Sequence, residues 1–153
     1  CTEANIVLGD LLRAGECFKR ERDVSPDLAS MLKPQLGNAI AAKSLDLGCD
    51  PETFKALFGL AEAVGAPDPR EVSKGLHSLI VNCSQDEGEK LKDITAFLAG
   101  KNRGMELVEL GFVPIIEQEE NRWRAQQWAQ YAVSLVPEGK EAVDNALARR
   151  NEG

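Results

Sequence analysis

The stretch Glu71–Ile80, EVSKGLHSLI, recurs 36 residues later as Leu107–Ile116, LVELGFVPII. Without a gap, glycine falls on glycine and an apolar residue falls on an apolar one at four further places. A longer helical pattern precedes each copy and ends at Val64 and at Gly100, again 36 residues apart. Recurrence at a fixed period is typical of helical repeat proteins, whose units bury their apolar faces against their neighbours. Accidental recurrence of apolar spacing between helices of similar length is the alternative.

Apolar residues at helical spacing, interrupted by Pro, Gly and Asp, extend this pattern over the whole chain. Ser25-Pro26, Asp50-Pro51 and Asp68-Pro69 are typical helix starts, and Ser84 to Glu87 resembles a capping box. No segment alternates with a two-residue period, so the sequence predicts an all-α fold. The expected helices cover 2–20, 26–34, 38–47, 51–64, 69–80, 84–100, 102–110, 112–119, 121–136 and 137–150, with a helix–glycine–helix corner at 35–40.

Length and charge limit the function classes. The chain has 153 residues, the size of a single domain over 1–153, and carries a net charge of −7. This balance argues against nucleic acid as a partner, since binding to phosphates needs a basic surface. No run of 18 apolar residues occurs, which excludes a transmembrane helix. Because the chain starts at Cys1 instead of Met, we expect a fragment of a longer protein. A mature lipoprotein would also begin with Cys.

Four cysteines allow three disulfide connectivities, and their spacing favours none. Thiols buried as small hydrophobic groups are the default expectation for Cys17, Cys49 and Cys83. A secreted factor with oxidised cysteines is the alternative.

The stretch from Leu98-Ala99-Gly100 to Val136-Pro137 and on to Val143 resembles an armadillo repeat. In that family a short helix ends at a glycine, a second helix has an early proline, and a long third helix lines the concave face. The resemblance implies a right-handed superhelix (an armadillo-like α-solenoid) of about 3–4 repeats, with Gly111 left-handed at a sharp corner. An irregular helical bundle is the alternative.

The resemblance does not extend to the peptide grip of the armadillo family. Family members that bind extended peptides place Trp and Asn one turn apart on successive third helices. The matching pairs here include Asp93 with Phe97 and Gln130 with Ser134. None of the pairs is Trp with Asn, so we do not expect a grip of the import-receptor type.

Catalytic and metal-binding residues are scarce. His77 is the single imidazole, which excludes a multi-histidine zinc site, and no nucleotide-binding or calcium-loop motif occurs. We therefore predict a protein that is not an enzyme and needs no cofactor.

The helix expected over 121–136 is the best candidate for a binding surface. Its predicted core face comprises Trp128, Tyr131, Ala132 and Leu135, whereas Trp123 lies off this face between two arginines. Tryptophan beside arginine is typical of an interface anchor, although Trp123 could equally cover a neighbouring repeat or loop. The candidate binding residues are Arg122, Trp123, Gln127, Gln130 and Ser134.

These features predict a protein–protein interaction module, such as a scaffold, adaptor or chaperone-like protein, in the cytoplasm. Acidic side chains elsewhere in the chain favour a basic partner segment, and equally they keep the domain in solution. The alternatives are a processed or secreted helical-bundle factor or effector and, less favoured, an enzyme. Secretion and lipid attachment through Cys1 both stay open.

Overall fold

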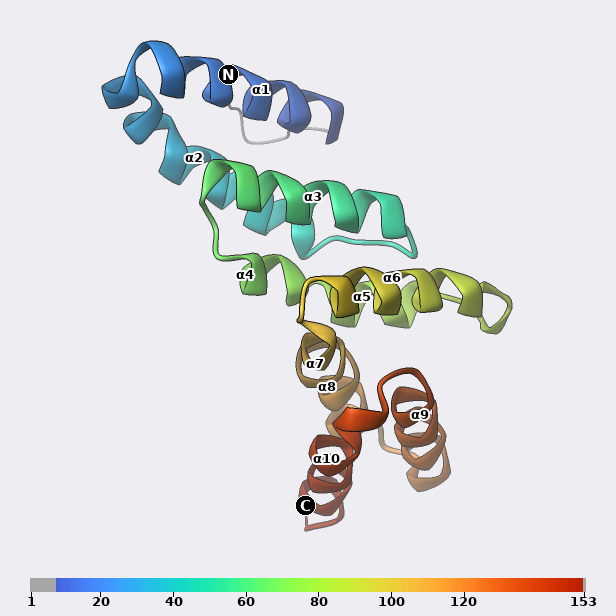
Figure 1. Ribbon diagram of the computed structural model, residues 1–153. Helices are drawn as coiled ribbons and strands as arrows, with labels where there is room; N and C mark the ends of the chain where they lie inside the picture. Colours follow the sequence, from blue (N-terminus) through green and yellow to red (C-terminus); the bar gives the residue numbers. More distant parts are fainter. Residues whose placement is uncertain (1–7, 153) are drawn as a thin grey trace. The chain divides into compact units, whose positions relative to one another are not determined.

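The computed structural model describes residues 8–152, and every regular element within that range is a helix (Figure 1). The prediction of an all-α fold is confirmed. No described helix is both long and apolar enough to cross a membrane. The helices are α1 (Leu8–Val24), α2 (Pro26–Ser44), α3 (Pro51–Val64), α4 (Pro69–Ser73), α5 (Leu76–Asn82), η1 (Gln85–Glu87), α6 (Gly88–Gly100), α7 (Gly104–Glu106), η2 (Leu107–Phe112), α8 (Val113–Gln118), α9 (Arg122–Leu135), η3 (Pro137–Gly139) and α10 (Lys140–Glu152).

The chain forms two compact units. Unit 1 contains the described residues up to Leu47 together with Glu52–Val72, and unit 2 contains Gly48–Pro51 and the described residues from Ser73 onwards. The assignment of 1–153 to a single domain stays a prediction. The proposed lipid attachment site, Cys1, lies outside the described residues.

Apolar packing among α1, α2 and α3 forms the core of unit 1. Phe54 and Phe58 of α3 are fully buried, with ring centroids 5.9 Å apart. The predicted corner at 35–40 is wrong, because α2 continues through Pro34 and Gly37 to Ser44. Gly37 instead permits close packing: a Cβ there would lie 2.9 Å from the Cβ of Ala66, in the loop after α3.

In unit 2, two predicted helix ends differ from the structure. The helix expected over 69–80 is divided by a turn before α5, and the helix expected to end at Leu110 continues through Gly111 as the π-helical η2. Gly111 does not adopt a left-handed conformation, which among described glycines occurs only at Gly65. Its role is steric, since a Cβ would lie 2.6 Å from Ile80 Cδ1 on α5.

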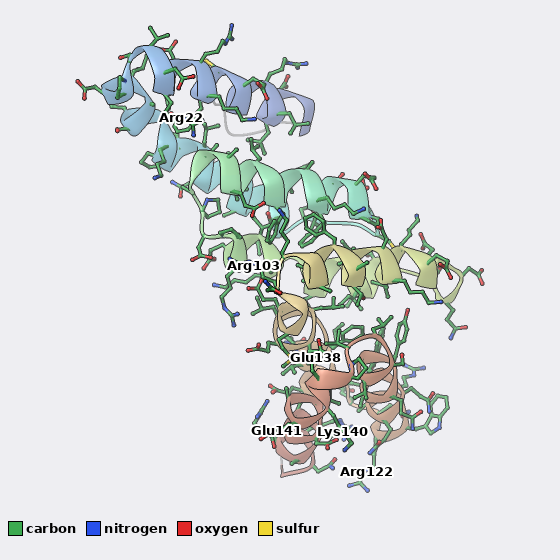
Figure 2. The ribbon with its side chains drawn as sticks, viewed as in Figure 1. Arg22, Arg103, Arg122, Glu138, Lys140 and Glu141 are labelled. Atoms are coloured by element: carbon green, nitrogen blue, oxygen red, sulfur yellow. A yellow bond between two sulfur atoms is a disulfide. The ribbon has the colours of Figure 1, made fainter. Side chains whose placement is uncertain are left out.

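One buried polar cluster in unit 2 joins Ser73 to α7 and the residue before it. The Ser73 hydroxyl donates a hydrogen bond of 2.7 Å to Glu106 Oε1, and Nη1 of Arg103, which is labelled in Figure 2, lies 2.6 Å from Glu106 Oε2. Ser73 is fully buried and Glu106 is 8% exposed. Both carboxylate oxygens therefore have partners, as a buried charge requires.

Helix boundaries recur at nearly the predicted period. The long helices α3, α6 and α9 begin at residues 51, 88 and 122, and the next α-helices after them, α4, α7 and α10, begin at 69, 104 and 140. Successive starts are thus 34–37 residues apart. The recurring element is a pair of helical segments. The second segment contains a turn before α5 in the first copy and the π-helical η2 in the second copy.

Candidate protein-binding groove

A groove of about 770 Å³ lies in unit 2 between α9 and the region where α5 ends and α6 begins. Two predicted binding residues, Trp123 and Gln127, line it. Arg122 (Figure 2), Gln130 and Ser134 are exposed on α9 but do not line it. The lining residues are Ile80, Val81, Cys83, Ser84, Gln85, Gly88, Leu91, Lys92, Trp123, Arg124, Gln127, Trp128 and Tyr131.

The sequence of α9 explains why large side chains border the groove. The Asn121 side chain caps the helix by accepting a hydrogen bond of 3.0 Å from the Arg124 backbone N–H. The stripe of α9 that is buried consists of alanines: Ala125, Ala129 and Ala132. Small residues let α9 pack closely against its neighbours. The bulky side chains of α9 lie on either side of this stripe, where they border the groove.

The predicted core face of α9 is therefore only partly right. Ala132 is buried, whereas Trp128, Tyr131 and Leu135 are half-buried. Both aromatic rings contact the fully buried Phe112: its centroid lies 6.2 Å from that of Trp128 and 5.8 Å from that of Tyr131, the latter edge-on. Such aromatic pairs have a defined geometry, so Phe112 holds one wall of the groove in place.

The opposite wall begins with the predicted capping box. The Ser84 backbone N–H and hydroxyl both donate 3.0 Å hydrogen bonds to Glu87 Oε1, while Lys90 Nζ lies 2.8 Å from Glu87 Oε2. The ammonium of Lys90 and the Ser84 donors lower the pKa of Glu87 from 4.5 to about 2. Glu87 is thus ionised at neutral pH and fixes the start of α6.

A disulfide between Cys49 and Cys83 closes one end of this wall. The expectation of thiols is therefore wrong for these two residues, whose Cα atoms lie 4.8 Å apart although 34 positions separate them in sequence. Local spacing could not predict the pair, because tertiary packing brings the residues together. Cys17 retains a thiol in α1, where it is half-buried.

Hydrogen-bond donors and cations dominate the polar lining of the groove. Lys92 and Arg124 contribute the charges, and no carboxylate lines it. Burial raises the pKa of the Tyr131 hydroxyl above 10, so this group remains a protonated donor. Within residues 8–152, the Arg124 guanidinium and the Trp123 indole form no hydrogen bond or ion pair with other groups of the protein.

Exposed apolar side chains also gather at the groove. Within the described part of unit 2, the large apolar residues that are strongly exposed are Val81 (56%) and Trp123 (69%). Both line the groove, and exposed apolar groups of this kind are typical of interaction sites.

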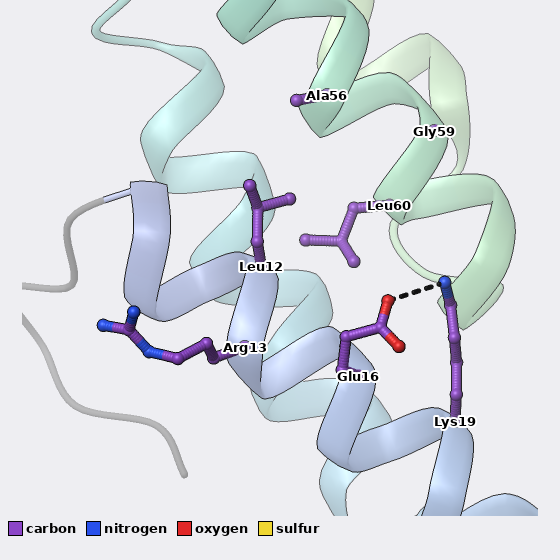
Figure 3. Close-up of a pocket in the computed structure, with 7 residues that line it drawn as sticks. All are labelled: Leu12, Arg13, Glu16, Lys19, Ala56, Gly59 and Leu60. Carbon is purple, nitrogen blue, oxygen red and sulfur yellow. Dashed lines mark hydrogen bonds and ion pairs between the residues drawn. The ribbon is translucent and has the colours of Figure 1, made fainter.

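Unit 1 has a smaller pocket, of about 410 Å³, between α1 and α3 (Figure 3). Leu12 and Leu60 point toward each other across it, and the Glu16–Lys19 ion pair, at 3.2 Å, borders it. This pocket contains no aromatic residue. The groove in unit 2 is larger and offers the more specific chemistry, so we take it as the candidate site.

Comparison of the chain with family models, curated proteins and solved structures finds no match. The sequence pattern placed Trp123 and Gln127 in the candidate site but missed Val81, Leu91 and Lys92. These residues belong to segments about 40 positions away, and only tertiary packing places them opposite α9.

Proposed function

We propose that the chain is a protein–protein interaction module whose binding surface is the groove of unit 2. The observation that supports this most directly is the position of Trp123, which is 69% exposed at the groove while the neighbouring aromatic rings are anchored on Phe112. A rigid apolar wall with an unpaired Trp and Arg beside it has the composition of an interface hot spot.

The recurring helix boundaries support a repeat architecture for this module. We propose that the recurring units stack as in an armadillo-like α-solenoid, although each consists of two helical segments and lacks a sharp corner at Gly111. In such an array each unit buries its apolar face against the next. The groove presents side chains from three successive recurring units, which supports a scaffold or adaptor role.

The Cys49–Cys83 bond favours a second candidate, a processed or secreted helical factor. Structural disulfides persist in oxidising compartments and are rare in the cytoplasm. We therefore propose that the module works in an oxidising compartment. Labelling of thiols in protein freshly isolated without reductant tests this: modification of Cys83 before reduction would favour the cytoplasmic location instead.

A random 12-residue peptide library displayed on phage tests the binding function. Peptides that the intact chain retains are synthesised with a fluorophore, and their affinities for variants are measured by anisotropy. Trp123→Ala should weaken binding by roughly 30- to 1,000-fold, corresponding to about 2–4 kcal/mol. Gln130→Ala, on the same helix outside the groove, should leave affinity unchanged.

The control separates two binding surfaces. If Gln130→Ala weakens binding as much as Trp123→Ala, the interface follows the exposed stripe of α9 instead of the groove. If no retained peptide loses affinity on Trp123→Ala, the groove is not the binding site of the module.

A further inference from the structure

We propose that the groove binds a peptide segment of a partner protein in which carboxylates stand beside apolar side chains. This inference rests on the proposed function and specifies the chemistry of the partner. It differs from the basic partner that the overall charge favours, because the lining of the groove differs from the rest of the chain.

The first argument is the contrast in charge. The chain has 25 Asp and Glu against 18 Lys and Arg, yet the thirteen residues that line the groove include Lys92 and Arg124 and no acidic residue. A surface with this lining attracts carboxylates and repels ammonium and guanidinium groups.

The carboxylates beside the groove do not cancel this charge. Glu87, which accepts hydrogen bonds from Ser84, is paired with Lys90 Nζ at 2.8 Å. Glu89 Oε1 lies 3.2 Å from Lys92 Nζ, but the side chains are 86% and 65% exposed. Exposed pairs of this kind contribute little and exchange readily with other partners. Lys92 can therefore turn to a carboxylate in the groove, and the Arg124 guanidinium is available without breaking a hydrogen bond or ion pair within the described residues.

The second argument is the excess of donors. The Arg124 guanidinium, the Lys92 ammonium and the Trp123 indole can only donate hydrogen bonds. Tyr131 adds a hydroxyl that remains protonated, since burial raises its pKa. A ligand that satisfies these groups must be rich in acceptors, which carboxylates and an extended peptide backbone both supply.

The third argument is the apolar part of the lining. Ile80 and Leu91 are buried beneath the groove, and the exposed Val81 and Trp123 stand at it. Val81 and Trp123 gain free energy only when a partner removes them from water, which requires apolar side chains between the carboxylates. The volume of about 770 Å³ accommodates several side chains.

Charge reversal on α9 tests the proposal with a matched control. Arg124 lines the groove and Arg122 does not, although both are exposed in the first turn of the same helix. Library peptides that need Trp123 for binding should be enriched in Asp, Glu, Leu and Phe. Arg124→Glu should weaken their binding about tenfold or more, and Arg122→Glu less than about twofold.

The outcomes distinguish this inference from the proposed function. If the Trp123-dependent peptides are basic or uncharged, or if both arginine variants have equal effects, the carboxylate inference is overturned while the groove remains the binding site. If no peptide depends on Trp123, both proposals fail. The double variant Lys92→Glu/Arg124→Glu should bind Lys-containing peptides more tightly than Asp- and Glu-containing ones. This reversal would give the strongest support.

Discussion

The two units are stabilised in different ways. Unit 2 contains the Cys49–Cys83 disulfide, the Ser73–Glu106–Arg103 cluster and, between α10 and α8, the Arg149–Glu117 ion pair at 2.6 Å. The described part of unit 1 has no disulfide. Unit 1 depends on its apolar core, and several of its large apolar side chains are exposed at the surface, namely Leu12, Val24, Leu28, Met31 and Leu45.

This difference matters for recognition. A binding surface needs side chains held in fixed positions, because each one that becomes ordered on binding costs about 0.5–1.5 kcal/mol. In unit 2, Cys83 of the disulfide lines the groove, and Phe112 packs against its aromatic wall. Both tryptophans of the chain, Trp123 and Trp128, line the groove. Indole fluorescence therefore follows unit 2, whereas far-ultraviolet circular dichroism follows the helices of both units.

Removal of the disulfide should give the largest effect. A crosslink that closes a loop of 34 residues contributes about 4 kcal/mol by restricting the unfolded chain. The variant Cys49→Ser/Cys83→Ser should shift the urea transition seen by fluorescence to lower concentration by that free energy. Cys17→Ser in unit 1 serves as the control and should leave this transition in place. Equal shifts would show that the crosslink does not stabilise unit 2 selectively.

Loss of the buried charge should have the next largest effect. Glu106→Gln removes the buried carboxylate charge that pairs with Arg103, which should cost about 2–3 kcal/mol in the fluorescence transition. Glu117→Gln removes the exposed partner of Arg149 and should cost less than about 1 kcal/mol. An equal cost for both variants would mean that burial does not strengthen the Glu106 cluster.

A pair of glycine substitutions examines the packing of unit 1. Gly37→Ala places a Cβ 2.9 Å from Ala66 Cβ and 3.3 Å from backbone atoms of Ala66 and Pro67, so it should destabilise the unit by about 1 kcal/mol despite the better helix propensity. Gly59→Ala meets no atom within 4 Å and should stabilise α3 by up to about 1 kcal/mol. Circular dichroism should detect both changes. A stabilising Gly37→Ala would contradict the close packing at this position.

Acidification should have the smallest effect of the four on the free energy of unfolding, through the capping carboxylate of Glu87. The pKa of Glu87 is about 2 in the folded chain against an ordinary 4.5, so the carboxylate stabilises the fold fully above pH 4.5. This contribution declines as the pH falls from 4.5 toward 2, because the carboxyl group of the unfolded chain binds a proton in this range while Glu87 of the folded chain stays ionised. The fluorescence-detected stability of the native chain should thus fall more steeply than that of Glu87→Gln. Parallel pH profiles would show that the capping carboxylate has no stabilising role.

Local signals in the sequence determined the helical fold and most helix starts. Ser25-Pro26, Asp50-Pro51 and the capping box at Ser84 act over three or four residues, so their physics is visible in the sequence itself. Interruptions were harder to predict. Gly37 and Gly111 are typical helix breakers, but both lie within helices, and a neighbouring segment packs where their side chain would be.

The sequence by itself thus determined an all-helical chain of recurring elements, with Trp123 and Gln127 on an exposed helix face. Only the tertiary structure joined Cys49 to Cys83 and placed Val81 and Lys92 opposite α9. The physical reason is distance along the chain: helix signals act over a few residues, whereas the groove is formed by segments about 40 positions apart. Packing of those segments also decided that its lining is basic in an acidic chain.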